Sequence, residues 1–200
     1  MERNIALHDC IEDHDDGITA IEQSFGDKVL IKTLWMSELN ERVRSNFKQF
    51  INNLGDKKKE KYKLFISLIE IIENDNPESS TTLEKLRALL PEWKWTNALW
   101  FLFRWKYERE ESPRKKEDIF AEWIFQGMLM NMPEDCFLAK TCERYDNLSD
   151  RTWLKNQEGW RSYEKTLRTT NTTYFPRLKN WEYLLLNDLL QEESGRGRVE

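Results

Sequence analysis

The sequence predicts an all-α protein: a single-domain helical bundle with a buried central helical hairpin. Three observations predict this class. The 200 residues include only 7 Gly and 5 Pro, which favours helices over turn-rich β structure. Apolar residues recur at spacings of three to five along most of the chain, which is the period of an amphipathic helix. The run Ala98 to Phe103 is apolar on every face and fits a helix that is buried on all sides.

The amino-terminal part of the chain predicts amphipathic helices. The first segment, through Gln23, mixes apolar and acidic residues and predicts a short helix broken near Gly17. Apolar spacing then predicts one helix from Lys28 to Leu54, with Gly55 placed to end it. A second helix is predicted from Lys57 to Glu73, because its apolar residues share one face.

The central part of the chain predicts the hairpin. After a loop over residues 74–80, Thr81 or Thr82 is expected to cap a short helix that runs to Leu90 and is ended by Pro91. The candidate central helix spans Trp93 to Arg109. Ser112 and Pro113 make the turn into a second apolar helix, from Arg114 to Met130, which Pro133 stops.

The rest of the chain predicts shorter helices. They are expected at residues 135–145, 150–156, 159–167 and 176–190. One helical domain is therefore predicted over residues 1–191, followed by a polar tail at 192–200 that is expected to be disordered.

Composition argues against several classes of function. The formal net charge is −5 and both signs are mixed along the chain, whereas a nucleic-acid binder concentrates positive charge on one face. The odd count of cysteines, Cys10, Cys136 and Cys142, and the lack of a leader resembling a signal peptide predict a reducing, cytoplasmic location. The sequence contains no run of 18 apolar residues, so it predicts no membrane span.

Residues suited to catalysis or metal binding are sparse. His8, Cys10 and His14 lie among aspartates, but their spacing matches no established zinc pattern, so a solvated acidic segment is the preferred interpretation. The glycines are scattered singly and form no phosphate-binding loop. We therefore expect no enzyme, no cofactor and no metal site.

Two tryptophan-rich segments carry the most information. In the first, Leu89 precedes a turn bearing Trp95 and the apolar helix start at Ala98 to Phe103. In the second, Trp153 and Leu154 are followed by Gly159 and Trp160. Together they resemble the first and second homology motifs of the Bcl-2 family, in particular divergent viral members of the adenovirus early-region type.

The resemblance departs from the family pattern at the turn. Thr96 stands where the family has glycine, and Asn97 stands where it has an arginine that pairs with an aspartate of the captured helix. The separation between the two motifs is also longer than usual in the family. These departures put one charge-assisted contact with the partner in doubt.

The resemblance implies a Bcl-2-like fold and a regulator of apoptosis, with inhibition as the expected direction. Such a protein binds the amphipathic death-motif helix of pro-apoptotic Bcl-2 family members in a hydrophobic groove, and through them it can associate with mitochondria. The residues that the resemblance and the helix periodicity place at this groove are Trp95, Asn97, Leu99, Trp100, Phe103, Leu39, Val43, Phe47, Trp153 and Trp160. Each aromatic among them has an alternative interpretation as a plain core residue.

Two other functions stay open. A helical accessory or adaptor protein, viral or host, would dock another protein through a tryptophan-rich surface, for which Trp153, Trp160 and Trp181 are candidates. A nucleic-acid-associated protein would require the basic residues near Lys57 and Arg114 to converge on one face, and it ranks last.

Overall fold

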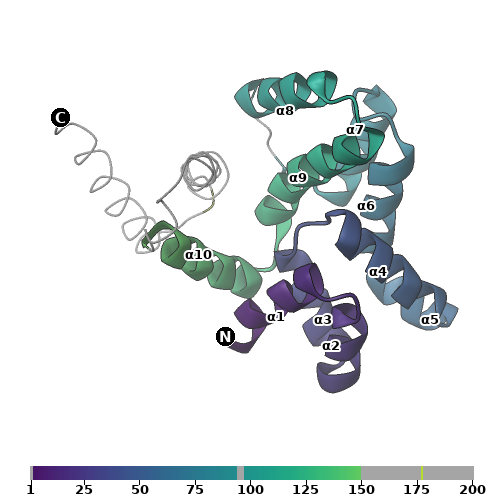
Figure 1. Cartoon of the computed structure of the whole chain (residues 1–200), viewed down its shortest axis with the longest axis vertical. Coiled ribbons are helices and arrows are strands. Elements are labelled where there is room, and N and C mark those ends of the chain that lie inside the picture. The colour runs from purple at the N-terminus through teal and green to yellow at the C-terminus, as the bar shows by residue number, and fades with distance from the viewer. Residues whose placement is uncertain (1, 94–96, 150–176, 178–200) are drawn as a thin grey trace. The chain divides into compact units, whose positions relative to one another are not determined.

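A computed structural model of the chain describes residues 2–93, 97–149 and 177. Every regular element in these ranges is a helix, and no strand occurs among them (Figure 1). The predicted all-α class is therefore confirmed. The chain divides into two compact units, Met1–Cys136 and Phe137–Glu200. The predicted single domain over 1–191 and the tail at 192–200 extend beyond the described residues and stay predictions.

Three short helices open the first unit and pack on one another: α1 (Glu2–Asp13), α2 (Gly17–Phe25) and α3 (Asp27–Met36). The predicted break near Gly17 is confirmed, since α2 begins at this residue. A Cβ atom at Gly17 would lie 2.1 Å from the carbonyl oxygen of Cys10, so only glycine allows α1 and α2 to approach this closely. Gly26, with a φ of 80°, joins α2 to α3.

The single helix predicted from Lys28 to Leu54 is wrong, because the chain breaks between α3 and α4 (Glu41–Asn52). Ser37 adopts extended backbone, and its hydroxyl donates to the Thr33 carbonyl at 2.9 Å. Asn40 then caps α4, its side-chain oxygen accepting from the Val43 backbone N–H at 3.1 Å. The apolar spacing hid this break because Leu39, inside it, is also buried.

The next helices are α5 (Asp56–Lys59), a 3₁₀ turn (Glu60–Tyr62), α6 (Lys63–Asn74) and α7 (Ser80–Leu89). The helix predicted from Lys57 to Glu73 is thus present with a tighter turn inside it. Two predicted boundaries are wrong. Helix α4 ends at Asn52, before Gly55, and the capping position of α7 is Ser79 instead of Thr81 or Thr82.

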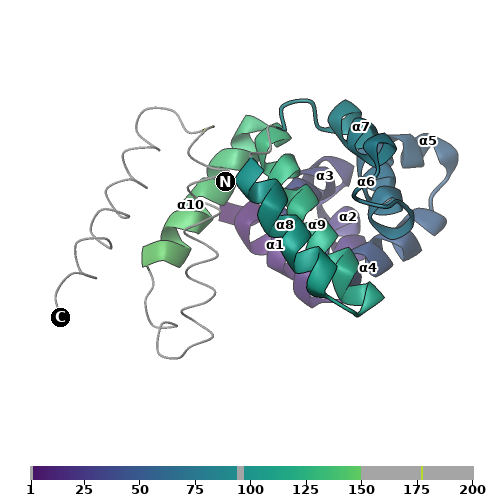
Figure 2. The same ribbon diagram turned by 90° about the horizontal axis from the view of Figure 1, so that it is seen from above.

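The predicted hairpin consists of α8 (Asn97–Arg109) and α9 (Pro113–Asn131), which pack against each other. Ser112 caps α9, its hydroxyl oxygen accepting from the Lys115 backbone N–H at 3.5 Å. Pro113 occupies the first turn, where its missing N–H costs no hydrogen bond. Figure 2 shows α8 lying along α9.

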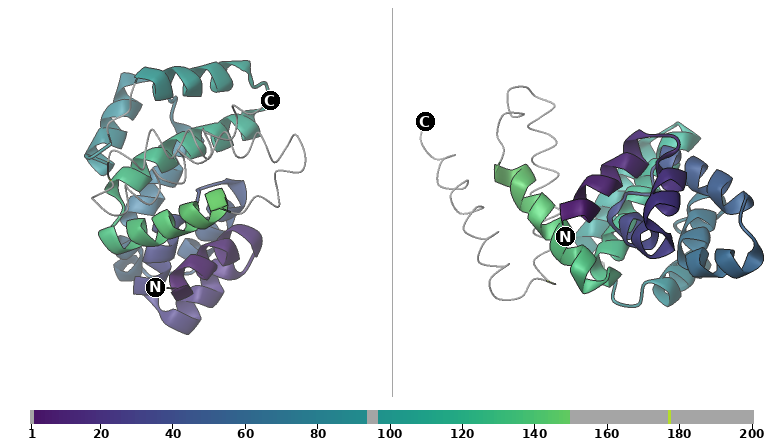
Figure 3. Two further views of the ribbon diagram at one scale, coloured as in Figure 1. Left: turned by 90° about the vertical axis from the view of Figure 1, so that its left-hand side faces the viewer. Right: turned by 90° about the horizontal axis from the view of Figure 1, so that it is seen from below.

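Helix α9 is the inner element of the first unit. It contacts α3, α4 and α6 as well as α8, and most of its side chains from Phe120 to Leu129 are buried. Helix α8 forms an outer layer on it (Figures 1 and 3). The expectation that residues 98–103 are buried on all sides is wrong at Phe101, which is 70% exposed.

The last described helix is α10 (Glu134–Ser149). It is longer than the helix predicted at 135–145, and Pro133 precedes it as predicted. Its start is tied to α3, because the Lys32 ammonium donates to the Asp135 carboxylate. In the second unit, the Arg177 guanidinium lies 4.2 Å from the centre of the Phe137 ring. The helices predicted at 150–156, 159–167 and 176–190 lie outside the described residues, apart from residue 177.

Candidate protein-binding surface

The inner side of α8 is held to α9 by aromatic rings. The Phe103 ring stacks on Trp123 with ring centres 4.6 Å apart, and Trp100 lies 5.1 Å from the same indole. Trp93 completes the cluster at 4.4 Å from Trp123. Gly127 makes room for it, since a Cβ atom there would lie 2.4 Å from the Trp93 ring. This packing fixes which side of α8 faces solvent.

The opposite side of α8 exposes apolar surface. Phe101 and Trp105 are 70% and 48% exposed, and their i, i+4 spacing places them on one face of the helix. The Arg109 guanidinium lies 4.2 Å from the centre of the Trp105 ring, within the range of a cation–π contact. We call this surface the α8 outer face and define it by Phe101, Arg104, Trp105, Glu108 and Arg109.

The charges of the α8 outer face are only partly paired. Arg104 is 2.6 Å from Glu108 and 2.9 Å from Glu78 in the loop before α7, and its hydrogen bond to Glu108 raises the pKa of the guanidinium. Within the described part of the chain, Arg109 has no carboxylate partner and contacts only the Trp105 ring. The surface therefore offers two apolar side chains next to an available positive charge.

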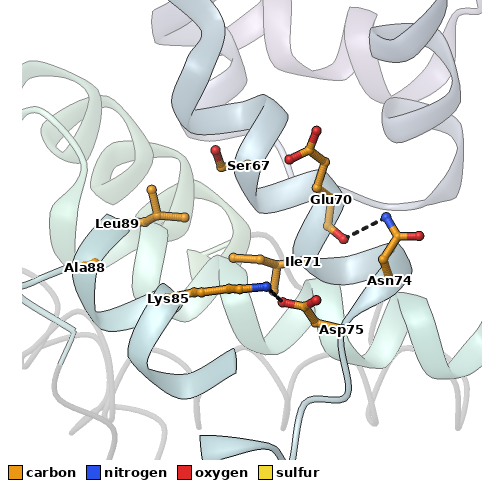
Figure 4. A pocket seen from close by; sticks show the side chains of 8 residues that line it. All are labelled: Ser67, Glu70, Ile71, Asn74, Asp75, Lys85, Ala88 and Leu89. Carbon is orange, nitrogen blue, oxygen red and sulfur yellow. Dashed lines mark hydrogen bonds and ion pairs between the residues drawn. The ribbon is translucent and has the colours of Figure 1, made fainter. Parts of the chain in front are cut away.

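A second feature is a hollow between α6 and α7 with a volume of about 590 Å³ (Figure 4). We call it the α6–α7 groove. Its lining residues are Ser67, Glu70, Ile71, Asn74, Asp75, Lys85, Ala88 and Leu89. Lys85 reaches from α7 to Asp75 at 2.7 Å and ties the two sides together. The groove is thus a depression lined by five polar and three apolar residues, with one ion pair across it.

Glu70 carries a negative charge in the α6–α7 groove that is available to pair with a ligand. Its backbone carbonyl accepts from the Asn74 amide at 3.1 Å, but its carboxylate makes no ion pair with another described residue. The side chain is exposed, whereas Ile71 beside it is buried. A ligand that enters this groove would therefore meet apolar surface and one unpaired negative charge.

The structure places the predicted partner-binding residues in different environments. Leu39, Val43, Phe47 and Phe103 are buried core residues, and Trp100 is half-buried. Three of the predicted residues, Trp95, Trp153 and Trp160, lie outside the described residues. For Asn97 and Leu99 the structure describes the backbone but not the side chain. Because two of the predicted floor residues, Trp95 and Leu99, have no described side chain, the predicted groove stays a prediction.

Sequence reasoning did not select the exposed residues. Phe101 sits inside an apolar run, so its exposure is invisible to local hydropathy. A signal was present at Trp105, because its neighbours Arg104, Lys106, Glu108 and Arg109 are charged and mark the polar side of the helix. A helical projection of residues 97–109 would have placed Phe101 and Trp105 together on that side.

The described residues form neither a metal site nor a membrane-spanning helix. His8 is buried while His14 is exposed, and within the described ranges no group of three His, Cys, Asp or Glu side chains could hold a metal ion. None of the helices described here combines the length and apolar character that a membrane crossing requires.

Comparison with family models, with curated proteins and with solved structures found no match to this chain.

Proposed function

We propose that this chain is a helical protein-binding module, and that an amphipathic helix of a partner protein docks on the α8 outer face. The observation that carries the proposal is the pair Phe101 and Trp105, exposed together beside the unpaired Arg109 guanidinium. Full burial of an apolar side chain contributes about 1.5–3 kcal/mol, and Phe101 and Trp105 still expose 70% and 48% of their surface. Trp and Arg are also the residue types on which binding energy concentrates in interfaces.

The charge of this surface defines the chemistry of the partner. A partner helix with apolar residues at i, i+3 or i+4 would cover Phe101 and Trp105, and an Asp or Glu next to them would reach Arg109. The death-motif helix of pro-apoptotic Bcl-2 family proteins is the partner that the motif resemblance implies. Regulation of apoptosis is therefore the specific form of this proposal.

A second candidate function is an accessory or adaptor protein that docks a partner unrelated to cell death. The observation that favours it is the shape of the site. Phe101 and Trp105 project from the outer side of a surface helix, whereas the predicted groove residues Leu39, Val43 and Phe47 are core. Both functions use the α8 outer face, so the same variants test them.

The test is a calorimetric titration of the full chain with a panel of death-motif peptides. We expect micromolar binding that weakens at least about tenfold in Trp105→Ala, because a central aromatic contact is lost. Phe25→Ala is the matched control, since Phe25 has the same 48% exposure but lies at the end of α2. Absence of binding to every peptide at tens of micromolar would overturn the apoptotic form.

A further inference from the structure

The α8 outer face and the α6–α7 groove have opposite characters on one chain. The first projects two aromatic side chains and an unpaired guanidinium, that of Arg109. The second is a depression of about 590 Å³ with three apolar lining residues and an unpaired carboxylate, that of Glu70. No residue is common to the two surfaces, so both are available at the same time.

The two surfaces are complementary in their charges and in the apolar side chains that each of them offers. The apolar part of the groove comes from Ile71, Ala88 and Leu89, against which an aromatic ring can pack. An arginine that follows the ring on the same helix would then reach Glu70 at the rim. In the free chain each of these two charges lacks a partner of opposite sign among the described residues, and contact between copies would supply one to both.

We propose that a second copy of this chain is the occupant of the α6–α7 groove: Phe101 and Trp105 of one chain insert between α6 and α7 of the next, with Arg109 paired to Glu70. The contact is heterologous, because two different surfaces meet. Each added chain leaves one groove and one α8 outer face uncovered. The assembly therefore either closes into a ring or grows with concentration.

Self-association of this kind regulates the surface assigned above to partner binding. A chain whose α8 outer face is inserted in a neighbouring groove cannot present Trp105 to another protein. This regulatory consequence rests on the proposed function, whereas the self-association itself does not. The two ideas fail separately, because peptide titration tests one and the mass of the purified chain tests the other.

The experiment is sedimentation velocity of the full chain over a dilution series from about 1 to 100 µM, with charge-swapped variants. We expect the mass of the native chain to exceed that of one chain at the upper concentrations. Glu70→Arg and Arg109→Glu should each weaken self-association about tenfold, since each places like charges face to face. Both residues are exposed, so the fold should tolerate both changes.

Combining the two substitutions in one chain identifies the contact. A chain that carries both Glu70→Arg and Arg109→Glu should self-associate like the native chain, because the pair is restored with its charges exchanged. Matched controls are Glu84→Arg on α7 and Lys115→Glu on α9, which change net charge equally at exposed positions outside both surfaces. We expect these controls to associate normally.

Three results would overturn the proposal. One is a native chain that stays monomeric up to 100 µM. Another is association that Glu70→Arg leaves unchanged while Trp105→Ala abolishes it, since that pattern indicates two α8 outer faces pairing with each other. The third is a doubly charge-swapped chain that associates no better than the single variants.

Discussion

At the scale of single residues, Tyr62 carries a buried hydroxyl that finds no hydrogen-bond partner among the described residues. Its ring is fully buried and packs edge-on against Phe50, with ring centres 5.5 Å apart. An unpaired buried polar group costs about 1–3 kcal/mol. We therefore expect Tyr62→Phe to raise the free energy of unfolding by about 1 kcal/mol in urea titrations at neutral pH. A loss of stability would show that the hydroxyl does have a partner.

The same tyrosine predicts a dependence on alkaline pH. Burial, with smaller contributions from Glu22 and Asp27, raises the pKa of Tyr62 well above its ordinary value of 10.0. Above that value the unfolded chain loses the phenol proton while the folded chain keeps it. Stability should therefore fall as pH rises past 10. Urea titrations between pH 8 and 11 should show a smaller fall in Tyr62→Phe than in the native chain.

At Gly127 of α9 there is no room for a side chain. Because a Cβ atom there would overlap the Trp93 ring, Gly127→Ala should displace Trp93 and destabilise the fold by about 1–3 kcal/mol, despite the better helix propensity of alanine. Thermal unfolding and near-ultraviolet circular dichroism measure both effects. The control is Gly55→Ala, where a Cβ atom meets nothing within 4 Å, and little change is expected.

At the scale of elements, one buried arginine joins three helices. Arg44 of α4 is 1% exposed, and its guanidinium donates to Glu117 at 2.9 Å and Asp118 at 3.1 Å, both on α9. Glu73 of α6 lies 3.7 Å from its Nε atom. The carbonyl oxygen of Leu39, in the break before α4, also accepts from it. The side chain thus anchors the end of that break to the inner helix.

Removing this guanidinium should therefore loosen α4 from α6 and α9. Arg44→Ala leaves the two partly exposed α9 carboxylates without their partner, and we expect a loss of about 1.5–3 kcal/mol in urea titrations. Lys48→Ala is the control, because Lys48 pairs with the same Glu73 at 2.8 Å from an exposed position. Its loss should cost less than about 1 kcal/mol. Equal effects of the two variants would contradict an anchoring role for Arg44.

The hairpin and the α3–α4 break show which elements local sequence determines. Ser112 and Pro113 start α9 where predicted, because capping and proline geometry act within a few residues. The break at Ser37 to Asn40 depends on a side-chain hydrogen bond to Thr33 and on a cap at Asn40, while the apolar period continues through it. The spacing of apolar residues indicates which residues are buried, so it cannot reveal a break between two helices when the residues of the break are buried too.

At the scale of the whole molecule, the arms of the hairpin differ in a way that hydropathy cannot predict. Both arms are apolar, but α9 is covered by α3, α4, α6 and α8, whereas α8 packs mainly on α9. Which arm becomes the inner one depends on contacts between residues far apart in sequence. For the same reason the sequence did not predict the exposure of Phe101 and missed the groove between α6 and α7.

Two ion pairs connect distant segments and contribute to the response of the fold to acid. Asp27 at the start of α3 pairs with Lys61, and Asp135 at the start of α10 pairs with Lys32. Hydrogen bonds from these lysines hold the pKa of each carboxyl below its ordinary value of 3.8. Each pair therefore contributes stability at pH values above 3.8. That contribution is lost as pH falls through the lowered pKa of the folded state.

Acid titration of the native chain should consequently show stability declining below about pH 4, and the decline should be shallower in a chain carrying Asp27→Asn and Asp135→Asn. Because both pairs are largely solvent-accessible, we expect the difference between the two chains to be small and to shrink in 1 M salt, where the Debye length falls to about 3 Å. Circular dichroism melts from pH 2 to 7 measure it. Parallel decline of the two chains would assign acid sensitivity to other carboxylates, such as those that surround Arg44.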